Sequence, residues 1–181
     1  MEFGDRSSFA ITIALDEHHG GIRLLGRMCY WVNGQQVGSF DETVSLGDAL
    51  TAMTWVVGDC GSREHCELFK STADKTFQLI NNVLYCGEGP EQVGVEAMSE
   101  EETPARFDIS IAVTTFNGWK TYLVECGDEA KILYRQSGGD VQEFVLPRGE
   151  FDAAIKATQQ LIEAWDAQVV AREESRKAGG P

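Results

Sequence analysis

Short turns are the feature of this sequence that most constrains its fold. Asn-Gly pairs stand at Asn33-Gly34 and Asn117-Gly118, and Gly127-Asp128 and Gly138-Gly139 separate further short segments. Asn and Gly tolerate the positive φ angles that the tightest hairpin turns need. Turns this short make the segments on either side antiparallel neighbours. The sequence therefore predicts antiparallel sheet.

The first 37 residues predict a β-hairpin. Residues 8–15, SFAITIAL, alternate large apolar side chains with small or polar ones, which is typical of a half-buried strand. A second strand is expected over residues 22–32, and the Asn33-Gly34 turn leads into a short return strand at residues 35–37.

Two helices are expected next, and a third near the end. Ser45 with Asp48, and Ser71 with Asp74, have the spacing of a capping box. The expected buried stripes are Leu46, Leu50, Met53 and Val57 in the first helix, and Phe77, Ile80 and Leu84 in the second. A last helix is predicted from about Glu150 to beyond Trp165, with Phe151, Ile155, Ile162 and Trp165 on one stripe.

The second half of the chain predicts a meander of four strands, at residues 107–114, 119–126, 130–136 and 141–146. The predicted fold class is α+β, with an N-terminal β-hairpin, two helices, a four-stranded antiparallel meander and a C-terminal helix packed on the sheet. We expect one domain over residues 1–170, with an acidic loop at 87–105 inside it, and a polar flexible tail over residues 171–181.

The charge balance bears on the choice of partner. Lys and Arg number 15 against 29 Asp and Glu, which gives a net charge of -14. Such a field repels nucleic acid and anionic membrane surfaces and attracts cationic partners. Basic residues do not cluster, so direct nucleic-acid binding is not expected. Solubility alone would also account for the acidic surface.

The five cysteines show no dense disulfide framework, which favours a reducing cytosol. In particular, Cys29, Cys86 and Cys126 lie in or at the end of apolar runs, where a thiol behaves as a small hydrophobe. The chain starts without the pattern of a signal peptide, and no run is long and apolar enough for a membrane span. We therefore expect a cytoplasmic protein without a membrane anchor.

Chemistry-bearing residues are sparse. His18-His19 supplies only two metal donors, and the five-residue spacer between Cys60 and Cys66, which contains His65, matches no common zinc pattern. No phosphate-binding loop, nucleophile elbow or zinc-protease motif is present. We expect no catalytic residues, no metal and no cofactor. The alternative is a small enzyme or a metal- or ligand-binding domain that uses the Cys60/His65/Cys66 segment.

Four segments, in this order, carry a resemblance to a known family: FGDRSSFAITIAL, GRMCYWVNGQQVGSFDETVSLGDAL, RFDISIAVTTFNGWKTYLVE and GEFDAAI. Together they resemble the bacterial polymorphic-toxin immunity family called immunity protein 42. The resemblance implies a protein encoded beside a secreted toxin, which binds the C-terminal domain of that toxin and neutralises it. It brings no catalytic residues with it. A scaffold or chaperone domain is a further alternative.

If the chain is such an inhibitor, it would act in the cytoplasm by occluding the active site or substrate channel of its toxin. Toxins that act in the cytosol are often basic, nucleases especially, and an acidic inhibitor would associate with them quickly. The acids of turns and loops are the candidate partner contacts, together with two tryptophans beside Asn-Gly turns. These candidates are Glu96, Glu100, Glu101, Glu102, Asp128, Glu129, Asp140, Trp31 and Trp119.

The four tryptophans divide into two pairs. Trp55 and Trp165 lie on expected helical stripes, so we expect them in the core. Trp31 and Trp119 flank Asn-Gly turns, where an indole either clamps the hairpin or lies exposed as an anchor for a partner.

Overall fold

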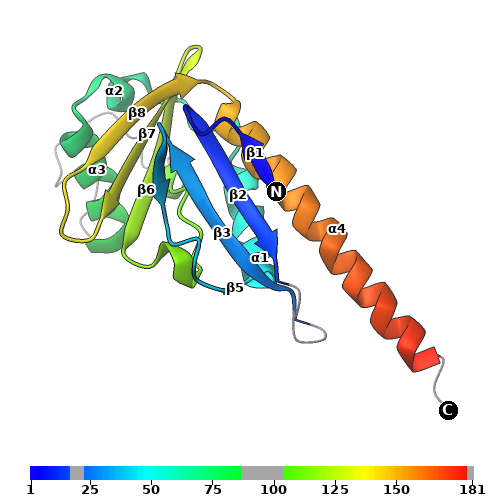
Figure 1. The fold of residues 1–181 in the computed structure, drawn as a ribbon. Helices are drawn as coiled ribbons and strands as arrows, with labels where there is room; N and C mark the ends of the chain where they lie inside the picture. The colour runs from blue at the N-terminus through cyan, green and yellow to red at the C-terminus, as the bar shows by residue number, and fades with distance from the viewer. Residues whose placement is uncertain (17–22, 87–103, 179–181) are drawn as a thin grey trace. The chain divides into compact units, whose positions relative to one another are not determined.

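A computed structural model of the chain describes residues 1–16, 23–86 and 104–178 (Figure 1). The chain divides into two units, each made of segments that are separated in the sequence. The first comprises Met1–Val57, Ile111–Asn117 and Phe151–Pro181, and the second Gly58–Ser110 and Gly118–Glu150. The expectation of one domain over residues 1–170 stays a prediction.

An antiparallel sheet forms the centre of the first unit. Its strands are β1 (Glu2–Gly4), β2 (Phe9–Leu15), β3 (Leu25–Val32), β4 (Gln35–Val37) and β5 (Val44–Ser45). The order is β1-β2-β3-β4, and β5 pairs with the other end of β3. The predicted hairpin is therefore present, and β1 and β5 enlarge it into a sheet of five strands.

The turn between β3 and β4 has the predicted conformation. Asn33 has a φ of 49° and Gly34 a φ of 76°, and Val32 pairs with Gln35 across the turn. Two successive residues at positive φ are what a type I′ turn requires.

Helix α1 (Leu46–Gly58) begins where β5 ends. The backbone N–H of Asp48 donates to Oγ of Ser45 at 3.2 Å, which confirms the predicted cap. The buried face of the helix differs from the prediction. It consists of Leu46, Ala49, Met53 and Val56, whereas the predicted Leu50 and Val57 are only half-buried.

The C-terminal helix α4 (Glu150–Ala178) packs on a sheet, as predicted. Its Phe151 ring lies 5.0 Å from that of Phe9 on β2 and 6.5 Å from that of Tyr30 on β3, between ring centroids. The contact is thus with the N-terminal sheet. Residues 171–178, expected as part of a polar tail, continue the helix.

The second unit contains a meander of three antiparallel strands: β6 (Trp119–Cys126), β7 (Glu129–Gln136) and β8 (Gln142–Pro147). Cys126 pairs with Glu129, so Gly127-Asp128 forms the predicted two-residue turn. The α+β class and the antiparallel meander are confirmed, but the expected fourth strand at residues 107–114 is absent.

The segment expected as that strand is extended without joining the sheet. Its burial alternates as predicted, because Phe107, Ile109, Ile111 and Val113 are buried and the residues between them are more exposed. Pairing with β6 is limited to a bridge between Asp108 and Tyr122 and a 3.0 Å bond from Ile109 N to Thr121 O. Next to these, the Ser110 hydroxyl takes the place of a backbone acceptor, since Thr121 N donates to its Oγ at 3.0 Å. The alternating burial therefore correctly indicated an extended segment. The Ser110 side chain interrupts the hydrogen-bond ladder between that segment and β6.

Short helices complete the second unit. They are α2 (Cys66–Lys70), α3 (Ala73–Asn81), the π-helical turn Asn82–Cys86 and the 3-10 turn Pro104–Phe107; a further 3-10 turn, Thr114–Phe116, belongs to the first unit. Ser71 does not cap α3 as expected: it ends α2, where its hydroxyl donates to Glu67 O at 3.0 Å, and Thr72 precedes α3. A buried cluster joins α2 and α3 to β6 and β7 through Leu68, Phe77, Leu79, Ile80, Phe107, Tyr122, Val124 and Leu133.

Every helix within the described ranges is too short or too polar to cross a lipid bilayer.

Candidate functional site

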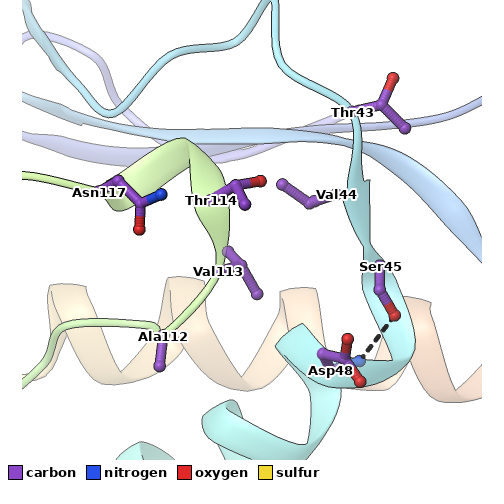
Figure 2. Close-up of a pocket in the computed structure, with 8 residues that line it drawn as sticks. All are labelled: Thr43, Val44, Ser45, Asp48, Ala112, Val113, Thr114 and Asn117. Atoms are coloured by element: carbon purple, nitrogen blue, oxygen red, sulfur yellow. Dashed lines mark hydrogen bonds between the residues drawn. The ribbon is translucent and has the colours of Figure 1, made fainter.

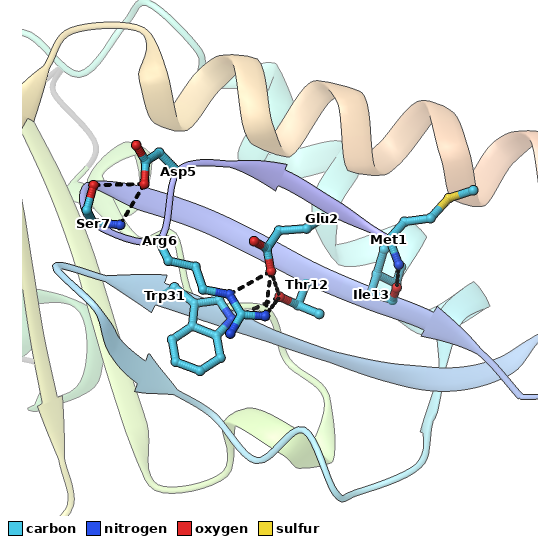
Figure 3. Close-up of polar contacts among 8 residues, drawn as sticks. All are labelled: Met1, Glu2, Asp5, Arg6, Ser7, Thr12, Ile13 and Trp31. Carbon is cyan, nitrogen blue, oxygen red and sulfur yellow. Dashed lines mark hydrogen bonds and ion pairs between the residues drawn. The ribbon is translucent and has the colours of Figure 1, made fainter.

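Trp31 belongs to a polar cluster that ties the first three strands together (Figure 3). Its indole N–H donates to Thr12 Oγ1 at 2.9 Å, and that hydroxyl in turn donates to Glu2 Oε2 at 2.6 Å. The Arg6 guanidinium lies 4.0 Å from the centroid of the indole ring and donates to the same Glu2 oxygen at 2.7 Å. These contacts hold the Trp31 indole against β2 and the turn after β1, and the half-buried ring leaves part of its surface for a partner.

Hydrogen bonds set the charge state of this cluster. Those from Arg6 and Thr12 hold the pKa of the Glu2 carboxyl below its ordinary value, and Ser7 lowers the pKa of Asp5 in the same way. Both carboxylates are therefore ionised at neutral pH. Glu2 holds the first strand to Thr12 of β2, and Asp5 stabilises the turn that follows β1 by accepting from Ser7.

The predicted contacts on the second sheet lie at its two opposite ends. Trp119 pairs with Gln136 at the end near Asp140, whereas Asp128, in the β6–β7 turn, and Glu129, the first residue of β7, lie at the other end. The eight residues of β7 separate these ends by roughly 25 Å. These residues therefore do not converge on one site. All three acids are exposed and Trp119 is half-buried.

Arg148 fixes the turn that carries Asp128. Its N–H donates to Asp128 O at 2.9 Å and its guanidinium to Gly127 O at 3.1 Å. The same guanidinium lies 3.2 Å from the carboxylate of the buried Glu125 and 2.8 Å from that of Glu64. This ion-pair network accounts for a buried carboxylate on β6 without a catalytic role.

The densest acidic group of the sequence, Glu96 and Glu100 to Glu102, lies outside the described residues. His18 and His19 do as well.

Two residues of the Cys60/His65/Cys66 segment, His65 and Cys66, have structural roles. Cys66 forms a disulfide with Cys126 across a Cα–Cα distance of 4.8 Å, which ties α2 to β6. His65 caps α2, since its Nδ1 accepts the Leu68 N–H at 3.3 Å. The expectation that Cys126 is a free, hydrophobic thiol was wrong, because a residue sixty positions away in sequence meets it in space. In the described part of the chain, no three His, Cys, Asp or Glu side chains gather as a metal-ligand set.

Trp55, which we expected in the core, is 78% exposed. The buried stripe of α1 contains Met53, and a residue two positions further along a helix points to nearly the opposite side. The prediction placed Trp55 on a buried helical stripe, but the stripe observed consists of Leu46, Ala49, Met53 and Val56. Trp165, on α4, is half-buried.

A pocket of about 340 Å³ opens beside the start of α1 (Figure 2). One wall is β5 with the first turn of α1, and the other is the segment around the 3-10 turn Thr114–Phe116. Its lining residues are Thr43, Val44, Ser45, Asp48, Ala112, Val113, Thr114 and Asn117. Val44 and Val113 are buried, while Asp48 and Asn117 are exposed at the surface. Such a pocket can hold a side chain, and it presents no catalytic set.

Comparison with known proteins identifies the family to which the chain belongs. The family model of immunity protein 42 matches residues 1–161. The chain belongs to this family. Among solved structures, this immunity protein is similar to the CdiI of Burkholderia dolosa AUO158, with a TM-score of 0.68 and 22% sequence identity over 87% of this chain and 97% of the other. At that identity the likeness shows a shared fold. None of the curated proteins matches the chain.

Proposed function

We propose that this immunity protein neutralises a cognate toxin domain in the cytoplasm, by binding it and covering its active site or substrate channel. The match of the family model over residues 1–161 carries the proposal. Inhibition by occlusion needs a stable surface and no reacting group. The arrangement described above is compatible with that, because Cys66 forms a disulfide and His65 caps a helix.

A basic toxin, such as a nuclease, suits the charge of this protein best. Its net charge of -14 produces a field that attracts a cationic domain from a distance. A nuclease carries positive charge where its substrate binds, so an acidic inhibitor is drawn to the surface that must be covered. We propose that Glu96, Glu100 to Glu102, Asp128, Glu129 and Asp140 contribute to this attraction, and that Trp31 and Trp119 are candidate contacts.

Co-expression tests the proposal. The probe is the C-terminal domain of the toxin encoded next to this protein, expressed in cells with or without the immunity protein. Growth should be restored by this immunity protein and not by an immunity protein of an unrelated toxin. Growth arrest in both cultures would contradict the proposal.

A titration of toxin activity separates binding from catalysis. A non-catalytic inhibitor should abolish activity at one equivalent and leave about nine tenths of it at one tenth of an equivalent, at any incubation time, because each copy covers one toxin domain. Progressive loss of activity at one tenth of an equivalent would indicate an enzyme instead.

A further inference from the structure

The solvent-facing side of α1 presents an aromatic ring that nothing in the described structure covers. This side consists of Asp48, Thr51, Thr54 and Trp55, all of them exposed, and we call it the α1 face. At 78% exposure, Trp55 is the most exposed large hydrophobic side chain of the described residues. Placing an indole in water forgoes a large hydrophobic gain, and tryptophan is the residue most enriched among interface hot spots.

The two threonines beside Trp55 make this face less polar than its sequence implies. Thr51 Oγ1 donates to Gly47 O at 3.1 Å, and Thr54 Oγ1 donates to Leu50 O at 3.0 Å. Both hydroxyl hydrogens are thus used inside the helix. A partner that approaches Trp55 meets a mainly apolar surface, which can be desolvated at low cost.

The pocket adjoins the α1 face at its N-terminal end. Asp48 belongs to both, and it precedes Trp55 by seven residues, or about 10 Å along the helix. Residues seven apart lie on the same side of a helix. The exposed Asp48 carboxylate therefore stands at the mouth of a pocket whose buried residues are Val44 and Val113, on the same side as the indole.

The sequence segment that contains β5 and α1 carries only negative charge. Between Arg27 and Arg63 there is no Lys, Arg or His, and the charged residues are Asp41, Glu42, Asp48 and Asp59. The pocket residues at 112–117 are uncharged. A Lys or Arg side chain has an aliphatic stem for the apolar pocket walls and a charged end for Asp48.

We propose that the α1 face and its pocket are a docking surface for a cationic segment of the toxin, with Trp55 as the apolar anchor and Asp48 as the partner of a Lys or Arg side chain inserted in the pocket. This assignment rests on the proposed function and names a binding surface for it. Trp55 and Asp48 contact the toxin directly and take part in no reaction.

Two exposed-residue variants and two matched controls test the assignment. Trp55→Ala removes the anchor and Asp48→Asn removes the charge at the pocket. Asp74→Asn is the control for charge, because Asp74 is also an exposed acid in the first turn of a helix, α3. Val170→Ala is the control for exposed apolar surface, since Val170 is 50% exposed on α4. Circular dichroism and thermal melting verify that all four fold.

The probe is the purified toxin domain encoded beside this protein, and the measurement is its Kd for each variant. Trp55→Ala should weaken binding at least about 30-fold, as expected for a hot spot, and Asp48→Asn about 5-fold with a smaller salt dependence. Both controls should stay within about twofold. Wild-type affinity for Trp55→Ala overturns the docking surface while the proposed function stands. Absence of binding by the wild-type protein overturns both.

Discussion

At the scale of single residues, Gly38 occupies a position where a side chain is disfavoured for two reasons, its backbone conformation and its lack of space. Its φ is 89°, in the region that favours glycine, and a Cβ there would lie 2.9 Å from two carbons of the Phe116 ring. That ring cannot easily move, because its centroid is only 4.6 Å from that of the buried Tyr30. Gly34 has a similar φ, 76°, with nothing within 4 Å of a Cβ.

Alanine substitutions at Gly34 and Gly38 separate the cost of backbone strain from the cost of steric crowding. We expect Gly34→Ala to lower the free energy of unfolding by about 1 kcal/mol through strain alone, and Gly38→Ala by about 3 kcal/mol because overpacking adds to the strain. Urea denaturation of both variants measures the difference. Equal losses would show that Phe116 yields at little cost.

Because the Cys29 thiol is buried, we predict that the free energy of unfolding falls at alkaline pH. Burial raises the pKa of Cys29 to about 11, whereas a thiol in an unfolded chain titrates near 8.5. Between these values the unfolded state releases a proton that the folded state keeps. The contribution of the protonated Cys29 thiol to the free energy of unfolding is therefore fully present below about pH 8.5. It is lost as pH rises towards 11, by at most about 1.4 kcal/mol per pH unit.

Comparison of the wild-type protein with Cys29→Ala isolates this group. Burial also raises the pKa of Tyr122 and Tyr134, but tyrosines in an unfolded chain titrate only near pH 10. From about pH 8.5 to 10, the free energy of unfolding should fall more steeply in the wild-type protein than in the variant. Parallel curves over that window would contradict the assignment.

Local chemistry decided which residues could be predicted from the sequence. The Asn33-Gly34 turn and the Ser45 cap depend on neighbours within three positions, and both were predicted correctly. The Cys66–Cys126 disulfide joins residues that only the folded chain brings together. Trp55 was misplaced because the prediction put it on a buried helical stripe, whereas it lies two positions from the buried Met53 and is exposed.

At the scale of elements, patterns of burial were more reliable than hydrogen-bond partners. The alternation from Phe107 to Val113 was real, but whether an extended segment joins a ladder depends on what lies beside it. The apolar stripe of the C-terminal helix was enough to predict the helix. It did not predict which sheet the helix covers, because a stripe requires an apolar neighbour but does not identify it.

The disulfide between α2 and β6 should contribute substantially to the stability of the second unit. It joins residues 60 apart in sequence, and a closed loop of that length is expected to contribute about 2–4 kcal/mol, chiefly by restricting the unfolded chain. The variant with both Cys66→Ser and Cys126→Ser should lose that much in urea denaturation. Cys86→Ser, at an exposed free cysteine, is the matched control.

A loss no greater than that of the control would mean that the disulfide contributes nothing.

Disulfides are uncommon in a reducing cytoplasm. The prediction of a reducing compartment therefore loses the support that it drew from the cysteines, and action in the cytoplasm requires the reduced protein to stay folded. Melting and toxin binding in dithiothreitol measure this directly.

At the scale of the whole molecule, the net charge of -14 leads us to predict how salt changes the rate of association with the toxin. Long-range attraction accelerates association and is screened by salt, whereas the contacts of the formed complex determine dissociation. Between about 50 and 500 mM salt, the association rate with a basic toxin domain should fall at least about tenfold while the dissociation rate changes much less. Rates that are independent of salt would rule out electrostatic attraction as the cause of recognition.

We propose that this member of the immunity protein 42 family works by forming a stoichiometric complex with its toxin. Calorimetric titration of the purified immunity protein into the toxin domain encoded beside it tests this most directly. We predict one binding event per toxin domain, with a Kd at or below about 10 nM, and loss of toxin activity in proportion to the complex formed. Absence of heat and of complex at micromolar concentrations of both proteins would contradict the claim.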